Sequence, residues 1–480
     1  MKLSYLASTI ASTTDLADID ITGIFFDSRK VTKNSLFVCI KGESVDGHNY
    51  AINAENAGAA VIVAEHQTDS TLPHIIVDDA RIALSKLSAI WFDNPQDKLK
   101  FIGITGTNGK TSTAFYVKRI LDSMGKKTGM IGTVCNIICD KVYTASVTTP
   151  EPYALYSLLN KMVEAGVEYV VMEVSSHSLV QNRIFGITYE TAVFTNLTQD
   201  HLDYHKTMEN YKAAKALLFN VSKSAVINID DATGKEYYDS VSCKKYSYST
   251  LYNSADFVGK DIKIKPSGVN FLAVTLGGIA RVGVSSPGGF TVYNALGAIG
   301  AVCALGFRFI DIIPHVLTLG GVDGRAQIIS GERDYTVMID YAHTPDGLKN
   351  ILSSVKKYAK ARVITLFGCG GDRDKTKRPI MAKVACEYSD YVVVTSDNPR
   401  TEDPMQIIND ILVGITLPKS NYTVIENREM AIHHAIEQAK PDDIVVLAGK
   451  GHEKYQILKD GKIDFDEEAI AIRIMEQLQK

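Results

Sequence analysis

A glycine turn followed by a lysine and two hydroxyl residues is the clearest chemical signal in this 480-residue sequence. The stretch "GITGTNGKTST" at 103–113 follows an apolar run and precedes apolar residues at helical spacing. A glycine turn between a strand and a helix lets backbone N–H groups approach phosphate oxygens. Lys110 could then reach the terminal phosphates of a nucleotide, and Thr111 could bind magnesium. We therefore predict a phosphate site, although the spacing misses the strict GxxxxGK[ST] pattern by one residue.

Magnesium bound to a nucleotide needs further hard ligands, preferably oxygen. Candidates follow two later apolar runs: Glu173, Asp200, His201 and His205. Ser175 and His177 lie in the first of these stretches and could suggest a serine hydrolase. The chain lacks the G-x-S-x-G elbow of such enzymes, so nucleophilic catalysis is disfavoured.

Composition favours a globular enzyme that acts on small molecules. Hydrophobic residues make up 45% and charged residues 22%, and 51 Lys and Arg against 55 Asp and Glu leave a net charge of −4. This balance argues against a nucleic-acid partner. The seven cysteines contain no Cys-x-x-Cys pair. The N-terminal segment is too weak for a signal peptide, and no apolar run reaches the roughly 20 residues of a membrane span, so we expect a cytoplasmic protein.

The order of apolar and polar segments predicts an α/β protein of about three domains. Short β-rich runs fill the first 87 residues, and "WFDNPQDKLK" near 88–97 is typical of a domain junction. Strands then alternate with helices, which indicates a mostly parallel sheet. A second break falls near 320–345, and the four apolar strands that follow it each end in a polar tail. These tails should line one cleft, because ligands bind beyond the carboxyl ends of parallel strands.

Eight motifs in order across 103–456 resemble the Mur ligases of peptidoglycan synthesis, in particular those that add the third residue of the peptide. They are "GTNGKTST", "TTPEP", "MEVSSHSLVQNR", "FTNLTQDHLDYH", "DYAHTPDGL", "GCGGDRDKTKRP", "DNPRTEDP" and "AGKGHEKYQ", with "FDSRKVTKNSLFV" upstream. The resemblance covers nearly the whole chain and is specific as a set.

This resemblance implies three domains: a UDP-sugar-binding α/β domain (1–88), a central P-loop ATPase domain with a parallel sheet (89–328) and a Rossmann-like amino-acid-binding domain (329–480). The implied reaction phosphorylates the D-glutamate γ-carboxylate of UDP-N-acetylmuramoyl-L-alanyl-D-glutamate with ATP. The amine of meso-diaminopimelate then attacks the acyl phosphate to form an amide. ATP and two Mg²⁺ ions are the implied cofactors, and a monomer is expected.

By matching position, the resemblance also implies roles for particular residues. The ATP site would contain Gly106, Thr107, Asn108, Gly109, Lys110, Thr111, Ser112, Asn294, Arg325, Asp340 and His343. The magnesium ligands would be Thr111, Glu173, His201 and Lys215, and Lys110, Glu173, His201 and Lys215 would carry the catalysis. Lys215 matches the carbamylated lysine of the family, whereas Lys212, one turn earlier, is expected to be an ordinary surface lysine.

Two further sets complete the implied site. The UDP-sugar-dipeptide would be held by Ser28, Thr148, Thr149, Ser175, Gln181 and Arg183. The meso-diaminopimelate pocket would contain Arg373, Asp397, Asn398, Pro399, Arg400, Gly449 and Glu453. Arg400 would select diaminopimelate, because lysine-adding relatives lack this arginine and a guanidinium suits the extra carboxylate. Gln327 and Thr291 depart from the family's usual Glu and Asn near the nucleotide.

Several alternatives remain at this stage. A lysine-adding Mur ligase would share most of these motifs. Folylpolyglutamate synthetases begin their phosphate loop in a similar way, but they usually have Gly in place of Thr111 and lack the N-terminal domain. A GTPase switch would be expected to contain Asn-Lys-x-Asp, whereas the chain has only Asn160-Lys161-Met-Val. A catalytically dead relative is disfavoured, because the lysine, the carboxylate and the histidine are all present.

Overall fold

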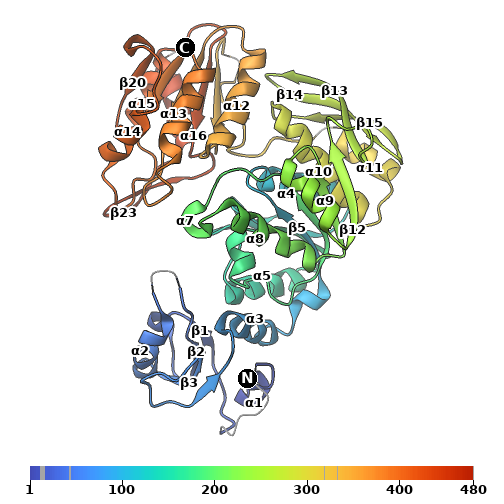
Figure 1. The fold of residues 1–480 in the computed structure, drawn as a ribbon, viewed down its shortest axis with the longest axis vertical. Helices are drawn as coiled ribbons and strands as arrows, with labels where there is room; N and C mark the ends of the chain where they lie inside the picture. Colours follow the sequence, from blue (N-terminus) through green and yellow to red (C-terminus); the bar gives the residue numbers. More distant parts are fainter. Residues whose placement is uncertain (11–16, 43–44, 318, 332, 479–480) are drawn as a thin grey trace. The chain divides into compact units, whose positions relative to one another are not determined.

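The computed structural model describes residues 1–10, 17–42, 45–317, 319–331 and 333–478 (Figure 1). These residues form two compact units. The first contains Met1–Gly103, Lys126–Glu190 and Asn220–Lys223, and the second contains Ile104–Gly125, Thr191–Phe219 and Ser224–Lys480. Part of the N-terminal segment weighed above as a signal peptide, 11–16, lies outside the described residues. Strands and helices alternate in both units, as expected for an α/β chain.

The first unit opens with a small parallel sheet of order β1-β2-β3-β4. Its elements are α1 (Leu3–Ala7), β1 (Ile24–Phe25), β2 (Ser35–Val38), α2 (Ala51–Asn56), β3 (Ala59–Ala64), β4 (His74–Ile76) and α3 (Ala80–Trp91). Asp79 caps α3, because its carboxylate accepts two backbone N–H groups of the first turn. The helix continues through residue 88, where the first domain was expected to end, and it buries Leu84 and Leu87 in the N-terminal core. The boundary itself stays a prediction.

The remaining strands of the first unit follow the order β9-β6-β7-β8. The elements here are β6 (Thr128–Ile131), β7 (Cys135–Ile138), β8 (Lys141–Thr144), α5 (Pro152–Glu164), β9 (Tyr169–Glu173) and α6 (Ser176–Val180). Strands β6 and β9 are parallel, whereas β7 and β8 form an antiparallel extension. Because β9 ends at Glu173, this carboxylate lies at the carboxyl end of a buried strand, as the sequence predicted.

The second unit begins with a sheet segment of order β15-β14-β13-β12-β11-β10. Its elements are β5 (Lys100–Thr105), which starts in the first unit, α4 (Lys110–Ser123), β10 (Tyr189–Phe194), α7 (Leu202–His205), α8 (Met208–Asn220), β11 (Ser224–Asn228), α9 (Ala232–Ser240), β12 (Lys244–Ser249), β13 (Phe257–Lys265), β14 (Gly268–Thr275), β15 (Gly278–Val284), α10 (Gly289–Ala304) and α11 (Phe309–Val316). Strands β10 to β13 are parallel. Strands β13 to β15 are antiparallel hairpins that the sequence analysis did not anticipate.

The C-terminal sheet has the order β16-β17-β21-β18-β19-β20 and is parallel except for β16. Its elements are β16 (Gln327–Ile328), β17 (Thr336–Asp340), α12 (Pro345–Tyr358), β18 (Val363–Phe367), α13 (Lys377–Tyr388), β19 (Tyr391–Val394), α14 (Pro404–Leu412), β20 (Tyr422–Val424), α15 (Arg428–Glu437), β21 (Ile444–Ala448), β22 (Tyr455–Leu458), β23 (Gly461–Asp464) and α16 (Glu467–Gln477). Helices α12, α13 and α14 pack on one face, and α15 and α16 pack on the other (Figure 1). The four polar tails therefore leave one edge of this sheet.

No helix among the described residues is both long and apolar enough to cross a membrane.

A buried ion pair joins α15 and α16 behind the C-terminal sheet. The guanidinium of Arg428 lies 2.8 Å from the carboxylate of Glu467, and both side chains are fully buried. Arg428 also donates to the carbonyl oxygens of Ser396, which lies just after β19, and of Ala448, the last residue of β21. Removing one partner from such a pair leaves an uncompensated buried charge.

Substituting Arg428→Met should therefore lower the free energy of unfolding by about 3–5 kcal/mol, measured in urea. Arg428→Met/Glu467→Leu should recover most of the loss, because no isolated carboxylate then remains. Arg473→Met removes the surface pair with Glu429 between the same helices and should cost less than about 1 kcal/mol. Equal losses in Arg428→Met and Arg473→Met would contradict this assignment.

Candidate active site

The loop between β5 and α4, at which the sequence predicts a phosphate site, needs glycine at two positions. Gly106 has φ 144° and Gly109 has φ 86°. A Cβ atom would lie 1.8 Å from Thr195 Oγ1 at the first position and 2.4 Å from Asn294 Oδ1 at the second. The predicted nucleotide residue Asn294 thus lies directly against the loop. The first turn of α4 then carries Lys110, Thr111 and Ser112.

Two residues that the sequence analysis did not single out hold the loop from the side. Asn196 Oδ1 accepts the backbone N–H of Asn108 at 2.9 Å, and Asn196 Nδ2 donates to the carbonyl oxygen of Asn108 at 3.1 Å. Thr195 Oγ1 donates to the same carbonyl at 2.6 Å. The Asn108 amide donates to Asp346 Oδ2 of α12 at 2.8 Å. The only sequence signal for this pair was a polar dipeptide directly after buried β10.

The side chains of Lys110 and Lys215 meet at one carbonyl oxygen. Lys110 Nζ donates to the carbonyls of Gly106 and Thr107 at 2.8 Å each, and Lys215 Nζ donates to the Gly106 carbonyl at 3.0 Å. Lys215 is 1% exposed. Burial, reinforced by the charge of Lys110, lowers the pKa of Lys215 well below its usual value. The environment of Lys215 therefore favours the neutral, nucleophilic form of its amine.

Asp200 and His201 lie beside this pair. Asp200 Oδ2 is 3.4 Å from His201 Nε2. Burial alone would raise the pKa of Asp200, but His201, His343 and Lys377 outweigh it and lower the pKa to about 2. Burial lowers the pKa of His343 to about 4, so its imidazole is neutral at physiological pH. His343 Nδ1 is 2.9 Å from the carbonyl oxygen of Tyr341, which fixes its ring.

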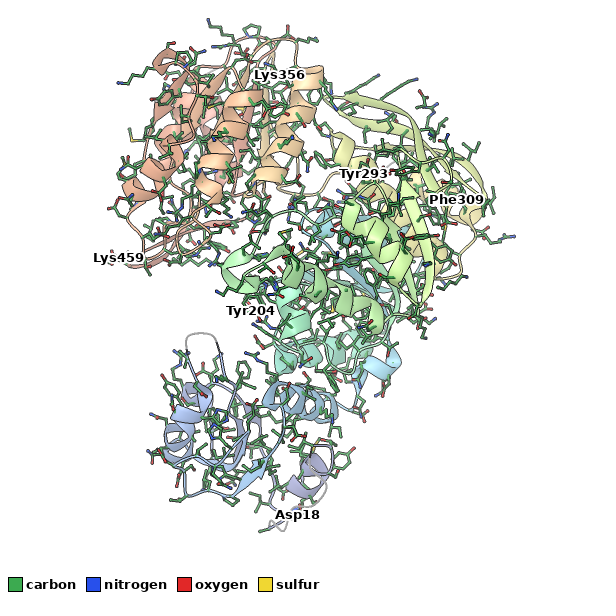
Figure 2. All side chains as sticks on the ribbon, in the orientation of Figure 1. Asp18, Tyr204, Tyr293, Phe309, Lys356 and Lys459 are labelled. Carbon is green, nitrogen blue, oxygen red and sulfur yellow. The ribbon has the colours of Figure 1, made fainter. Side chains whose placement is uncertain are left out.

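The short helix α7 follows His201, and a series of side-chain contacts leads from this helix to the loop after β5. Figure 2 shows Tyr204 on this helix. Its ring packs edge-on against His205, with 4.8 Å between centroids, and the His205 ring stacks on Tyr211 at 5.0 Å. The Tyr211 hydroxyl lies 3.2 Å from Thr107 Oγ1. His205 is therefore a packing residue in this structure, whereas His201 lies at the start of the helix.

Arg325 reaches the first turn of α4 from the segment that precedes the C-terminal sheet. Its Nη2 donates to Thr111 Oγ1 at 3.0 Å, and its guanidinium lies 4.7 Å from the ring centre of Tyr341. Asp340 holds the turn behind Arg325, because Asp340 Oδ2 accepts the backbone N–H of Ala326 at 2.7 Å. The other Asp340 oxygen also accepts a backbone N–H. Asp340 thus orients Arg325.

The two departures from the family pattern have different surroundings. Gln327 bridges two segments, because its Oε1 accepts the N–H of Gly324 at 2.7 Å and its Nε2 donates to Glu468 Oε1 at 2.9 Å. A glutamate at this position would face the carboxylate of Glu468, so an amide suits this chain. Thr291 is buried in α10, and its hydroxyl has no hydrogen-bond partner among the described residues.

In the first unit, Glu173 is held by a threonine that the sequence analysis overlooked. The backbone N–H of Thr133 donates to Glu173 Oε1 at 2.9 Å, and the Thr133 hydroxyl donates to Oε2 at 3.0 Å. A Cβ at Gly132 would lie 2.4 Å from Oε1, so glycine permits this approach. Thr149 Oγ1 donates to the carbonyl of Glu173, and Thr148 Oγ1 lies 3.0 Å from Thr133 Oγ1.

The other predicted sugar-dipeptide residues join the same cluster, with one exception. The Ser175 N–H donates to Thr149 Oγ1 at 3.1 Å, and Arg183 Nη1 donates to the Thr149 carbonyl at 2.9 Å. Gln181 Oε1 accepts two further bonds from Arg183. Ser28 instead begins a 3-10 helix, Ser28–Lys30, within the N-terminal sheet region. The structure thus brings five of the six predicted residues together.

At the edge of the C-terminal sheet, the predicted amino-acid residues share a buried lysine. Asn398 Nδ2 donates to Glu453 Oε2 at 2.9 Å. Lys450 Nζ donates to Asn398 Oδ1 at 2.8 Å and lies 3.1 Å from Asp397 Oδ1. Gly449, with φ 113°, turns the chain beside Asp397. Asp397, Asn398, Gly449 and Glu453 are therefore one cluster, and Lys450 is a member that the sequence analysis missed.

Arg400 and Arg373 form a cationic pair at the same edge. Arg400 has φ 54°, and its Nη1 donates to the Gly371 carbonyl at 2.8 Å. A Cβ at Gly371 would lie 1.9 Å from the Pro399 carbonyl, so the two loops pack tightly. Burial and the charge of Arg373 lower the pKa of Arg400. Within the described part of the chain, no carboxylate lies at ion-pair distance from either guanidinium, which suits a ligand carboxylate.

The Gly106 geometry gives a direct test of the phosphate loop. Gly106→Ala places a Cβ against Thr195 Oγ1 at a positive φ, so the loop must shift. Strain of about 1–3 kcal/mol should weaken ATP binding by about 5- to 150-fold, measured by titration. Gly289→Ala is the matched control, since its Cβ meets nothing within 4 Å. Unchanged ATP affinity in Gly106→Ala would argue against a phosphate role for the loop.

Comparison with known proteins assigns all three parts of the chain. Residues 20–95 match the Mur ligase family catalytic domain, 104–302 the Mur ligase middle domain, and 324–451 the Mur ligase glutamate ligase domain. A solved structure of a UDP-N-acetylmuramoyl-L-alanyl-D-glutamate–2,6-diaminopimelate ligase superposes with a TM-score of 0.69 at 32% identity, covering 98% of both chains. These matches confirm the predicted three-domain α/β fold class.

Curated relatives are similar over almost their full length. The chain is 46% identical over 467 residues to a UDP-N-acetylmuramoyl-L-alanyl-D-glutamate–2,6-diaminopimelate ligase of Clostridium perfringens, covering 95% of each chain. It is 44% identical over 491 residues to the ligase of the same name in Bacillus licheniformis, covering all of both. The chain therefore belongs to the Mur ligase family.

Proposed function

We propose that this ligase joins meso-diaminopimelate to the D-glutamate γ-carboxylate of UDP-N-acetylmuramoyl-L-alanyl-D-glutamate, with ATP converted to ADP and phosphate, in peptidoglycan precursor synthesis. The observation that carries the choice of amino acid is the pair Arg373 and Arg400, which lies beside Asn398 without an acidic partner among the described residues. The names of the curated relatives agree with this choice.

The phosphoryl step requires charge neutralisation more than covalent help from the protein. A γ-carboxylate oxygen attacks the terminal phosphorus of ATP, and the bond to ADP breaks. Lys110 would hold the terminal phosphates, and the backbone N–H groups of the loop would bind their oxygens. Arg325, oriented by Asp340, reaches Thr111 and would add a second cation. The resulting acyl phosphate makes the carbonyl carbon a good electrophile.

The amide then forms at the same carbonyl carbon. The amine of the amino acid attacks, phosphate leaves and the nitrogen loses a proton. Thr148, Thr149, Ser175, Gln181 and Arg183 would hold the sugar-dipeptide, with Ser28 near the uridine. Their shared hydrogen bonds support a single, rigid recognition surface.

The opposite charges at the C-terminal edge match a zwitterion with an extra carboxylate. Arg400 and Arg373 would bind the far carboxylate of meso-diaminopimelate through parallel hydrogen bonds. Asp397, Asn398 and Glu453 supply carboxylate and amide oxygens for an ammonium group. L-Lysine has no far carboxylate and would bring its own ammonium toward the guanidinium groups.

Magnesium would supply further positive charge on the phosphates when bound. No group of three or more His, Cys, Asp or Glu side chains in the described residues could hold a metal by itself. The proposed ligands are of mixed type: Thr111, Glu173, His201 and a carbamylated Lys215. The lowered pKa of Lys215 supports this modification, because carbon dioxide reacts with a neutral amine. Carbamylation would convert the side chain into an anionic oxygen donor.

The domain boundaries after 88 and 328, the cytoplasmic location, the two magnesium ions and the monomeric state stay predictions. A lysine-adding ligase is the remaining alternative, and Arg400 decides between the two amino acids. A folylpolyglutamate synthetase-like activity is disfavoured by the UDP-sugar region, by Thr111 and by the full-length relatives.

Phosphate release from ATP should require both the UDP-dipeptide and an amino acid. The kcat/KM for meso-diaminopimelate should be about 10⁴-fold higher than that for L-lysine. Arg400→Ala should collapse this ratio, mainly through lost diaminopimelate turnover, because the far carboxylate loses its bidentate partner. Arg308→Ala, which removes an exposed pair with Asp311, is the control and should leave the ratio unchanged. Equal wild-type rates with both amino acids would favour the lysine-adding alternative.

Equilibrating the protein with ¹³C-bicarbonate should give a carbamate signal in NMR spectra. Lys215→Ala should lose both this signal and activity, since it removes the buried amine whose pKa is lowered well below its usual value. Lys212→Ala is the matched control on the same helix, because Lys212 pairs with Glu236 at the surface. An active Lys215→Ala variant, or a signal that survives this substitution, would exclude the modification.

A further inference from the structure

Lys450 is a fully buried cation that no part of the proposed chemistry uses. Its side chain is 0% exposed. Its Nζ donates to Asn398 Oδ1 at 2.8 Å and to Glu453 Oε2 at 3.3 Å, and it lies 3.1 Å from Asp397 Oδ1. The contact with Asp397 is a buried ion pair. Lys450 therefore bonds Asn398 and Glu453 while it pairs with Asp397.

These partners come from two loops that follow non-adjacent strands. Asn398 follows β19 and Glu453 follows β21, and β18 lies between these strands in the sheet. The two loops are joined directly, because Asn398 Nδ2 donates to Glu453 Oε2 and the backbone N–H of Ile457 donates to Asn398 Oδ1. Lys450 adds a further connection from a fully buried position, since its Nζ bonds both Asn398 and Glu453.

Lys450 also decides which way the Asn398 amide faces. The Asn398 carbonyl oxygen accepts from Lys450 Nζ and from the backbone N–H of Ile457 at 2.9 Å. Its amide nitrogen is therefore left to donate to Glu453 Oε2. A flipped amide would place its N–H₂ group against two donors. One cation thus fixes the amide and holds one oxygen of Glu453.

The positive charge of Lys450 also affects the ionisation of the neighbouring Asp397. Burial would raise the pKa of Asp397, but Lys450 and Arg428 outweigh it and hold the pKa below its ordinary value. Lys450 is therefore one of the two cations that favour the ionised form of Asp397 in its buried position. The carboxylates of Asp397 and Glu453 at this cluster suit an ammonium group.

We propose that Lys450 is a positioning residue for the incoming amino acid: it locks the Asn398 and Glu453 loops in the arrangement that binds the amino-acid substrate, without contacting that substrate. This inference rests on the proposed function. It predicts that loss of Lys450 harms the amino-acid step and spares formation of the acyl phosphate.

Hydroxylamine separates the two steps, because it can attack an acyl phosphate without occupying an amino-acid pocket. With ATP and the UDP-dipeptide, Lys450→Met should form the hydroxamate at a rate within about twofold of wild type. Its kcat/KM for meso-diaminopimelate should fall about 100-fold, as expected for a displaced binding group, chiefly through a raised KM. The KM for ATP should not change.

Lys454→Met is the matched control, since Lys454 lies on the same loop but is 73% exposed and pairs with Asp466. It should behave as wild type in both assays. If Lys450→Met does not fold, Lys450→Gln retains an amide donor and provides the same comparison. A parallel loss of both reactions, no loss of either, or failure of both variants to fold would overturn the positioning role. A wild-type enzyme that forms hydroxamate but rejects meso-diaminopimelate would instead overturn the proposed function.

Discussion

The carbonyl oxygen of Gly106 is the point at which two lysine side chains converge, and this crowding of cations controls the chemistry of the central region. Lys110 and Lys215 both donate to that oxygen. Because they are close and one is buried, it is costly for both to carry a proton, so the pKa of the buried Lys215 is lowered well below its usual value. Lys110 is the less buried of the two lysines and is the one proposed to hold a phosphate. The glycine itself is dictated by Thr195, which leaves no room for a side chain.

The C-terminal edge follows a related electrostatic rule. Cations with carboxylate partners lie behind the surface, where Arg428 pairs with Glu467 and Lys450 with Asp397 and Glu453. The half-buried Arg400 lies at the rim without such a partner among the described residues. A buried ion pair adds little net stability, but losing one member destabilises the fold strongly because the other charge is left unpaired. Such pairs therefore favour one arrangement of the loops. The rim cation remains available for a ligand.

Much of the site could be predicted because its residues occupy strand ends and turns with strong local signals. Gly106 and Lys110 follow one apolar run and Glu173 ends another, and ligands bind beyond the carboxyl ends of parallel strands. Sequence reasoning missed residues that are far from these groups in sequence but contact them in the folded chain. Thr133, Asn196 and Lys450 are ordinary polar residues in sequence, and only their contacts with Glu173, Asn108 and Asn398 reveal a role. The hairpins β13 to β15 were missed as well, since their two-residue turns, Pro266-Ser267 and Leu276-Gly277, are not strong hairpin signals.

The sequence alone determined the α/β class, the glycine loop after β5 and the family resemblance, because periodicity, glycine turns and ordered motifs are local properties of the chain. The tertiary structure alone decided the burial and lowered pKa of Lys215, the orientation of the Asn398 amide and the partners of Gln327. These depend on burial and on atoms that are far apart in sequence: Gly106 and Lys215 are separated by 109 positions and Asn398 and Lys450 by 52. Electrostatic interactions act through space, so charge states and side-chain orientations follow from the packed arrangement of the chain.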